Sequence, residues 1–441
     1  MSTPSANKTE ATGQASATVA EATRVWGRIG VLSFGGPAAQ IALMHREVVE
    51  ERNWLSERQF LNALSFCMLL PGPEAMQLAT YAGWRMHGTL GGLIAGLLFI
   101  LPGAAIMLAL AGVYAAFGNV PLVEAIFFGI KAAVVIIVIE ALIRVSKRAL
   151  NGGLYWAIAA LTFVAIFFFA LPYPLIVIAA GLVGMFAAVP NPRTDDGSAS
   201  APRSWGDMLR TTAVWLLIWL GPLLALRVIL PDSMLNAIAV FFSKLAVVTF
   251  GGAYAVLAYM GQDVVDRAGW LTAGEMMDGL GLAETTPGPL ILVTQFVGFV
   301  AAEKIGGFWF GAVAAGVTLW ATFAPCFLWI FAGAPYIEWI SNQPRLKGAL
   351  NAITAAVVGV ILNLSIWFAL HVFFARVDKY ENGVFTTWWP QLLTFQWPAF
   401  IVAGIAAFLI FRRHLGLPAV LLICAGVGLI LSGITMPIMA E

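Results

Sequence analysis

Apolar residues dominate the chain in long runs that are separated by short polar stretches. A helix needs roughly 20 predominantly apolar residues to cross a bilayer. Runs that approach this length predict an all-α integral membrane protein with about 13 transmembrane segments. The predicted segments are 25–45, 58–84, 89–117, 124–143, 153–170, 172–189, 209–230, 236–260, 274–302, 306–333, 346–371, 397–411 and 417–437.

The stretch from Phe34 to Pro73 recurs 216 residues later, from Phe250 to Pro289. The two copies align without a gap over 40 positions, of which 14 are identical. Both begin with Phe-Gly-Gly, contain a Trp-Leu pair and end with Pro-Gly-Pro. Agreement of all these features in one register indicates an internal duplication.

Polar segments divide the chain around this duplication. Residues 1–21 are rich in Ser, Thr and Ala and lack an apolar core, so they predict a disordered cytoplasmic tail and not a secretory signal. The first repeat then covers 22–189. Residues 190–208 have the composition of a flexible polar linker, and 209–230 form a connecting transmembrane helix. The second repeat covers 231–441.

The placement of Lys and Arg near the predicted span ends puts the N-terminus in the cytoplasm. Only the basic residues of 46–58 disagree with this orientation. Because 209–230 adds one crossing, the second repeat starts from the side opposite to the first. Inverted-topology repeats of this kind recur in secondary transporters, whose substrate site lies at the repeat interface near the membrane midplane. The sequence therefore predicts two inverted-topology repeats.

Composition excludes several other classes of protein. Only 11% of the residues are charged, against about 25% in soluble domains. The net charge of +1 gives no basis for binding nucleic acid. Cys67, Cys326 and Cys424 form no CxxC pair, which argues against a disulfide framework, a structural zinc site or a dithiol centre. No nucleotide-binding, hydrolase, zinc-protease or dinucleotide motif is present. We therefore predict neither an enzyme nor a bound cofactor or metal.

Each Pro-Gly-Pro triplet interrupts an apolar segment, so we expect a broken or re-entrant helix there. Proline removes a backbone donor and clashes with the preceding turn. A helix that restarts after the triplet directs its unsatisfied N–H groups and its positive dipole end at the break. Two such helix starts would suit an anion, whereas the alternative is a pair of kinks that only shape the bundle. The predicted binding residues are Pro71, Gly72, Pro73, Pro287, Gly288 and Pro289.

The Phe-Gly-Gly motifs admit a break or a close helix contact, and packing alone is the alternative. A cation lies six residues before each motif. Because a buried cation in a membrane marks a pathway or has a partner, we predict that the two cations are counter-charges for a divalent oxyanion. Alternatively, one anchors its helix at the surface and the other snorkels. The predicted residues are Arg28, Phe34, Gly35, Gly36, Lys244, Phe250, Gly251 and Gly252.

Further polar residues near the breaks are candidates for coupling or support. Glu74 directly follows Pro73, whereas its repeat counterpart is Leu290. This asymmetry suits a proton-coupling carboxylate, although Glu74 could equally interact with the dipole of the helix that it begins. The candidates for coupling or support are Glu74, Gln77, Lys131, Glu284 and Thr286.

The motifs resemble those of the chromate ion transporter family in its long, two-domain form. The first copy is close to the family pattern, and the resemblance covers nearly the whole chain after residue 22. In the second copy, Ala253 replaces the equivalent of Pro37 and Leu290 replaces that of Glu74. The motifs that carry the resemblance are Ser33-Phe34-Gly35-Gly36-Pro37, Leu70-Pro71-Gly72-Pro73 and Leu101-Pro102-Gly103.

The resemblance implies a multi-pass protein of the bacterial inner membrane, a secondary transporter that exports chromate and gives chromate resistance. Sulfate, a dianion of the same shape, is the alternative substrate, and either uniport or antiport would serve. A membrane-embedded chromate reductase or a non-transporting sensor is an alternative of another class. The expected partners are the transported anion and the lipid bilayer. A homo-oligomer is compatible with the sequence, which gives no sign of one.

Overall fold

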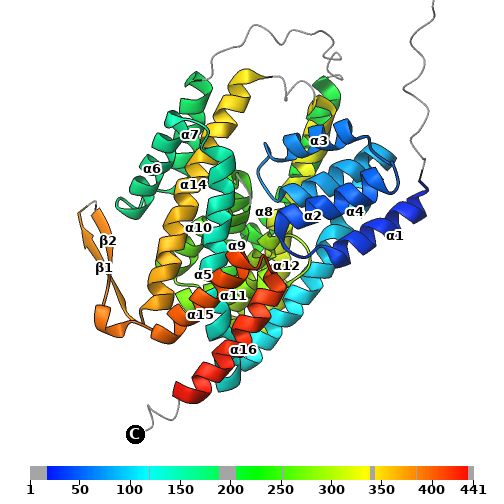
Figure 1. Ribbon diagram of the computed structural model, residues 1–441. Coiled ribbons are helices and arrows are strands. Elements are labelled where there is room, and N and C mark those ends of the chain that lie inside the picture. Colours follow the sequence, from blue (N-terminus) through cyan, green and yellow to red (C-terminus); the bar gives the residue numbers. More distant parts are fainter. Residues whose placement is uncertain are drawn as a thin grey trace, which may run out of the picture.

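The computed structural model describes residues 17–118, 120–187, 205–250, 253–337, 343–383 and 385–435. Nearly all of them are helical (Figure 1). The elements of the first half are α1 (Val19–Leu32), α2 (Gly36–His45), the π-helix η1 (Arg46–Glu50), α3 (Glu57–Cys67), α4 (Glu74–Phe117), α5 (Pro121–Ala149), α6 (Gly153–Phe167) and α7 (Tyr173–Ala187).

Helix α8 (Trp205–Ile229) leads into the second half, which repeats this order from α9 onwards. Its elements are α9 (Met234–Val248), α10 (Ala253–Gly261), the π-helix η2 (Gln262–Arg267), α11 (Ala273–Thr285), the 3₁₀ helix η3 (Leu290–Leu292), α12 (Val293–Gly333), the 3₁₀ helix η4 (Ala334–Tyr336), α14 (Pro344–Phe373), β1 (Val377–Asn382), β2 (Phe385–Pro390), the 3₁₀ helix η5 (Leu392–Thr394), α15 (Trp397–Ala407), the π-helix η6 (Phe408–Arg412) and α16 (Leu417–Thr435).

Two helices begin earlier than the sequence predicts. Helix α1 starts at Val19, inside the predicted tail, because the Thr18 side chain accepts a hydrogen bond from the Glu21 N–H and caps the first turn. Helix α8 starts at Trp205, inside the predicted linker. Residues 1–16 and 188–204 lie outside the described part of the chain, so the disordered tail and most of the linker remain predictions.

Long apolar helices confirm a helical membrane protein. Among the described residues, five helical segments are long and apolar enough to cross a bilayer. These segments are Glu74–Phe117, Pro121–Ala149, Gly206–Ile229, Leu290–Tyr336 and Pro344–Phe373. Five shorter apolar helices accompany them, so the total number of crossings remains a prediction.

Helices α4 and α12 each consist of two arms that are joined by a sharp turn. The turns lie at Gly88 and Gly307, whose φ angles of 62° and 73° favour glycine. A Cβ atom at Gly83 would lie 2.3 Å from the carbonyl oxygen of Gly91, so the arms of α4 pack backbone against backbone. Both turns fall where the sequence predicts a boundary between spans.

The two halves of the chain exchange packing partners. Helix α14 packs along α6 and α7, and α5 packs along α15 and α16 (Figure 1). Glycine allows the close approach in both places. A Cβ atom at Gly129 of α5 would lie 2.0 Å from the carbonyl oxygen of Cys424 on α16. One at Gly359 of α14 would lie 2.3 Å from the carbonyl oxygen of Ala159 on α6. Each half therefore completes the core of the other.

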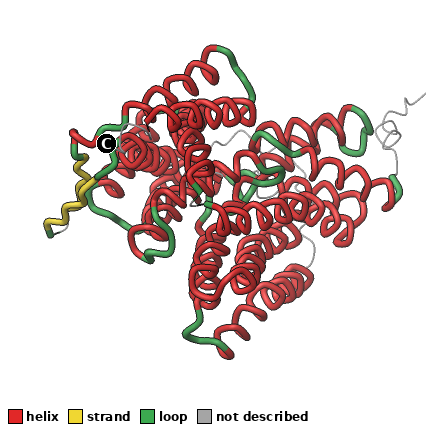
Figure 2. Tube along the Cα trace, turned by 90° about the horizontal axis from the view of Figure 1, so that it is seen from below, coloured by secondary structure: helices red, strands yellow, loops and turns green. Residues whose placement is uncertain are grey.

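Strands β1 and β2 form an antiparallel hairpin between α14 and α15, with Val377 opposite Pro390. The hairpin lies at the edge of the molecule (Figure 2). The all-α prediction missed it, because the segment between the last long spans has no apolar run. Its aromatic and β-branched residues favour strands, and Trp388 and Trp389 are among them.

The Gly129 contact allows a test of the exchanged packing. Gly129→Ala is expected to lower the free energy of unfolding by about 1–3 kcal/mol, because the new methyl group would overlap the α16 backbone. Gly404→Ala on α15 is the matched control, since a Cβ there meets no atom within 4 Å. Thermal unfolding in detergent measures both. Equal melting temperatures for the two variants would contradict the packing.

Candidate functional site

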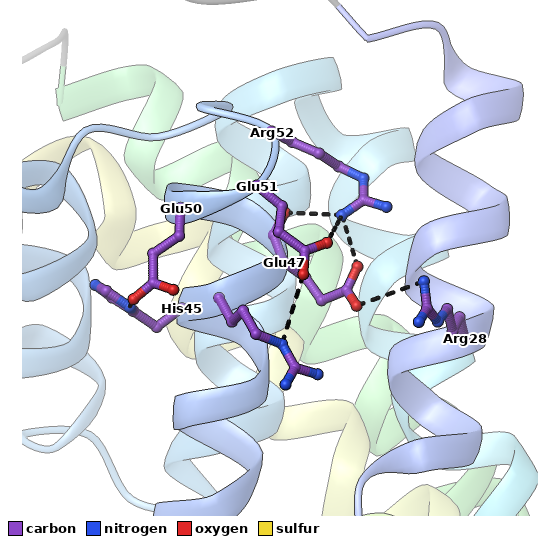
Figure 3. Close-up of polar contacts among 7 residues, drawn as sticks. Arg28, His45, Glu47, Glu50, Glu51 and Arg52 are labelled. Atoms are coloured by element: carbon purple, nitrogen blue, oxygen red, sulfur yellow. Dashed lines mark hydrogen bonds and ion pairs between the residues drawn. The ribbon is translucent and has the colours of Figure 1, made fainter.

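The first Phe-Gly-Gly motif is a turn between two helices. Helix α1 ends just before it, and Gly35 and Gly36 have φ angles of 88° and 78°. The chain then folds back, so that Nη1 of Arg28 on α1 lies 3.7 Å from Oε1 of Glu47 on η1 (Figure 3). The predicted break at this motif is confirmed.

The second Phe-Gly-Gly motif separates α9 from α10 at the equivalent positions. The N–H groups of Phe34 and Phe250 donate to the carbonyl oxygens two residues earlier, at 2.9 Å and 3.1 Å. Gly251 and Gly252 lie outside the described residues, so their part in the site remains a prediction.

Both Pro-Gly-Pro triplets separate two helices, as the sequence predicts. Helix α4 starts directly after Pro73, and η3 starts directly after Pro289 and continues into α12. The glycines reverse the chain direction with positive φ angles of 117° at Gly72 and 89° at Gly288. The helix starts therefore lie where the anion-binding hypothesis requires them.

The second triplet lies at the tip of a helical hairpin. Near the end of the first arm of α12, Nζ of Lys304 lies 2.7 Å from Oε2 of Glu275 and 3.2 Å from the carbonyl oxygen of Trp270. Farther along, a Cβ at Gly279 would lie 2.3 Å from the Phe296 ring. Helix α11 and this arm therefore run side by side. The hairpin is a break of the helix at the triplet, as the sequence predicts, and its path through the bilayer remains a prediction.

The triplet of each copy is hydrogen-bonded to the Phe-Gly-Gly turn of the other. The Gly72 N–H donates to the carbonyl oxygen of Thr249 at 2.9 Å, and the Gly288 N–H donates to that of Ser33 at 2.8 Å. The two hydrogen bonds are equivalent: in each, the triplet glycine of one copy donates to the residue just before the Phe-Gly-Gly motif of the other copy.

Local chemistry explains why these groups meet. Glycine carries the only backbone N–H of each triplet, because proline has none. Ser33 and Thr249 directly follow α1 and α9, where the helix carbonyls lack partners of their own. Their hydroxyl groups donate to the carbonyl four residues earlier. Gln40 adds bonds from Nε2 to the carbonyl oxygens of Gly288 at 2.6 Å and Ser33 at 3.2 Å.

A cavity of about 10 Å³ lies where these turns meet; we call it the central cavity. Most of its wall consists of repeat counterparts, namely Pro37 with Ala253, Pro73 with Pro289 and Glu74 with Leu290. A volume of 10–15 Å³ holds about one water molecule, so a tetrahedral oxyanion does not fit without movement. The lining residues are Pro37, Gln40, Pro73, Glu74, Ala75, Ala253, Pro289 and Leu290.

The two predicted counter-charges lie away from the central cavity. Arg28 shares Glu47 with Arg52, whose Nη1 lies 2.6 Å from Glu47 Oε2 (Figure 3). Glu47 is buried and Arg28 is largely exposed. Lys244 is exposed on α9. Neither cation lines the cavity, so their role as counter-charges remains a prediction.

Of the residues predicted to support transport, only Glu74 lines the central cavity. Gln77 is buried beside it and donates from Nε2 to the carbonyl oxygen of Pro71 at 2.7 Å. This bond supplies the protein partner that a carbonyl freed by proline requires inside a membrane.

The other predicted supporting residues lie elsewhere. Glu284 is buried and accepts a hydrogen bond from the Tyr254 hydroxyl at 2.9 Å. The Thr286 hydroxyl donates to the carbonyl oxygen of Leu282 at 2.6 Å. Lys131 forms an ion pair with Asp278 at 3.1 Å in a different cavity.

Sequence reasoning missed three residues of the site. Ser33 and Thr249 are hydroxyl residues at equivalent positions in the two copies, so a comparison of the repeats could have found them. Gln40 has Val256 as its counterpart, and its role depends on the approach of the other half of the chain.

Comparison with known proteins agrees with this architecture. A model of the family described as chromate transporter matches residues 20–185 and 236–429. The chain belongs to the chromate transporter family. The two matched segments cover both repeats, as in the long two-domain form, and membership identifies a transporter and not an enzyme.

Individual relatives match over most of their length. A chromate transport protein of Pseudomonas aeruginosa is 33% identical over 350 residues, which cover 76% of this chain and 77% of the relative. A probable chromate transport protein of Synechococcus elongatus is 31% identical over 340 residues, or 77% and 81% of the two chains.

An uncharacterized transporter of the archaeon Methanocaldococcus jannaschii is 30% identical over 353 residues, or 78% of this chain and 83% of the relative. The family therefore extends beyond bacteria, and location in a bacterial inner membrane remains a prediction. No solved structure matches the chain.

Gly288→Ala is expected to lower chromate transport at least about tenfold, because a side chain at this left-handed position costs about 1–2 kcal/mol and displaces the triplet from Ser33. Gly307→Ala is the matched control for the Gly288→Ala variant. Gly307 has a similar positive φ angle, but a Cβ there meets no atom within 4 Å. Chromate flux from membrane vesicles measures both, and equal losses would contradict a role of the triplet beyond general stability.

Proposed function

We propose that this protein is a secondary transporter that exports chromate across the bacterial inner membrane and thereby gives chromate resistance. One observation carries the proposal. Two helix starts from different halves, after Pro73 and Pro289, converge on a single cavity in a chain of the chromate transporter family. The Synechococcus relative is named a probable chromate transport protein and the Pseudomonas relative a chromate transport protein, which supports chromate as the substrate.

We propose further that the halves are inverted-topology repeats, related by an approximate two-fold axis in the membrane plane. The reciprocal bonds of Gly72 and Gly288 support such an axis, since a two-fold operation exchanges equivalent contacts. The exchanged packing of α5 and α14 supports it too. If both copies form the same hairpins, the number of membrane crossings falls equally in the two repeats. Helix α8 still adds one crossing between them, so the second repeat remains inverted relative to the first.

The substrate-binding groups of this proposal are the two triplets, the two Phe-Gly-Gly turns and the backbone N–H groups at the starts of α4 and η3. N–H groups at a helix start, together with the positive end of the helix dipole, favour an anion. The central cavity must widen before a dianion enters. We propose that the halves move against each other to open it, as repeats do in alternating access.

Glu74 gives the central cavity a carboxylate on one side only, because Leu290 occupies the equivalent position. In a medium of low dielectric constant, an ionised carboxylate in the cavity wall repels a dianion that enters the cavity. We therefore propose that Glu74 is protonated when the anion binds, and that Arg28 and Lys244 attract the anion from outside the cavity.

The direction of transport follows from the membrane potential. Moving one charge through 100 mV is worth about 2.3 kcal/mol, so a dianion that leaves an inside-negative cell gains about 4.6 kcal/mol. Export needs no ATP. Sulfate has the same charge and shape and is the alternative substrate. Membership of a transporter family disfavours the alternatives of a reductase or a sensor.

Purified protein in liposomes is expected to carry chromate toward the positive side of an imposed membrane potential. The rate should rise with the potential, because the potential acts on the charge of the anion. Parallel measurements with labelled sulfate identify the preferred anion, and liposomes without protein are the control. A rate that does not respond to voltage would contradict export driven by the potential.

Arg28→Ala and Lys244→Ala are each expected to reduce chromate resistance and flux at least about tenfold, as loss of a counter-charge would. Lys347→Ala is the matched control, since Lys347 is another exposed lysine on an apolar helix. Protein levels in the membrane are measured at the same time. Normal resistance in both variants would remove these cations from the mechanism.

A further inference from the structure

A second, larger cavity lies at the open end of the α11–α12 hairpin, apart from the central cavity. Its volume is about 710 Å³, which falls within the usual range for ligand pockets. We call it the vestibule. Its walls are the end of α4, the start of α5, the start of α11, the first arm of α12 and the end of α14. Its main polar side chains are Tyr114, Lys131, Glu275, Asp278, Lys304 and His371.

Asp278 is the most deeply buried charged group of the vestibule, with a side chain only 6% exposed. Its Oδ2 atom lies 3.1 Å from Nζ of Lys131 and accepts a hydrogen bond from the Tyr114 hydroxyl at 2.9 Å. Its Oδ1 atom is buried and has no hydrogen-bond partner. A buried acceptor without a donor costs about 1–3 kcal/mol, so this oxygen is a free position for a proton.

The charged groups that line the vestibule include more carboxylates than lysines. Glu275 on α11 is paired with Lys304 on α12. Glu303 on α12 and Glu124 on α5 also line the vestibule. Four carboxylates thus face two lysines, and a cleft lined by an excess of one charge concentrates ions of the opposite sign. His371 on α14 also lines the vestibule, and imidazole is a side chain that commonly exchanges protons in proteins.

The ion pair between Asp278 and Lys131 joins α11 to α5 nine residues before the second triplet begins. One turn farther along α11, a Cβ at Gly281 would lie 2.2 Å from Cγ2 of Ile130, so the two helices touch directly. Helix α11 then ends at the second triplet, whose Gly288 bonds to Ser33. The ion pair therefore fastens the helix that leads into the second triplet, whose Pro289 lines the central cavity.

The ion pair has no charged equivalent in the other half of the chain. The repeat counterpart of Asp278 is Asn62, and that of Lys131 is Thr354. In an inverted repeat these positions face opposite sides of the membrane. The titratable pair would consequently be accessible from one side only, which is the property that a coupling site needs to sense a gradient.

We propose that Asp278 is a proton-binding site that couples transport to the proton gradient. A proton from the vestibule binds Oδ1 of the ionised carboxylate, neutralises Asp278, releases Lys131 and loosens α11 from α5. Loss of the proton restores the pair. This proposal rests on the proposed transport function and adds to it the coupling ion and the group that binds it.

The test uses the full-length protein in liposomes with the voltage and the pH gradient imposed separately. In the wild-type protein, a pH gradient at zero voltage is expected to drive chromate accumulation. Asp278→Asn should keep voltage-driven flux and lose accumulation driven by the pH gradient. Asp263→Asn is the matched control, because Asp263 also contacts a cation, Arg267, and a tyrosine, Tyr259. It should retain both kinds of flux.

Two further variants identify the titrating group. Tyr114→Phe removes a hydrogen bond that stabilises the ionised carboxylate, so the pH profile of flux should move to higher pH. His371→Gln should leave the profile in place. Chromate itself takes up a proton as the pH falls, which changes the flux of every variant in the same way. Comparing variants at the same pH removes this contribution.

Accumulation by Asp278→Asn under a pH gradient would overturn the proton site while leaving the transport function intact. A shift of the pH profile in His371→Gln would overturn it as well. If the wild-type protein shows voltage-driven flux but no response to the pH gradient, the ion pair is only a structural link between helices. Absence of any flux would overturn the transport function together with the coupling site.

Discussion

Two backbone hydrogen bonds hold the centre of this protein together, from Gly72 to Thr249 and from Gly288 to Ser33. In a Pro-Gly-Pro triplet the glycine N–H is the only donor, and inside a membrane it must have a partner within the protein. Both donors find a helix-terminal carbonyl in the other half of the chain. The position of each triplet, and hence of each helix start, therefore depends on the opposite half.

Differences between the repeats carry the chemistry that symmetry alone would not supply. Glu74 and its counterpart Leu290 both line the central cavity, and Gln40 has only Val256 as a counterpart. A strictly symmetric protein would respond equally to conditions on both sides of the membrane. In the proposed inverted repeat, residues shared by the copies hold the triplets in place, whereas unshared polar residues would let the protein respond differently to each side of the membrane.

Much of the local structure could be predicted from the sequence, because Gly and Pro act on their own segment of backbone. The breaks at both triplets and at the first Phe-Gly-Gly motif follow from this chemistry, and α8 lies close to its predicted place. The sequence left a broken and a re-entrant helix as alternatives at each triplet, because the hairpin becomes apparent only when Lys304 meets Glu275. Apolar length alone cannot distinguish a crossing from a hairpin.

The remaining misses have the same physical origin. Ser33 and Gly288 are far apart in the chain, and nothing local in either predicts that they bond. Asp278 lies in a segment of mixed polarity that gives no sign of an ion pair. Its partner Lys131 belongs to the first half of the chain. Interactions between the halves require knowledge of how the halves pack, which periodicity and motif spacing do not contain.

Labelling from one side of the membrane tests the central claim most directly. Thr89 and Phe308 are exposed residues that directly follow the equivalent turns of α4 and α12. The native cysteines Cys67, Cys326 and Cys424 are buried and should not react. With single cysteines introduced as Thr89→Cys or Phe308→Cys, a membrane-impermeant maleimide added to intact cells should label only one of the two variants, and inside-out vesicles should reverse the result. Labelling of both variants from the same side would contradict an inverted repeat.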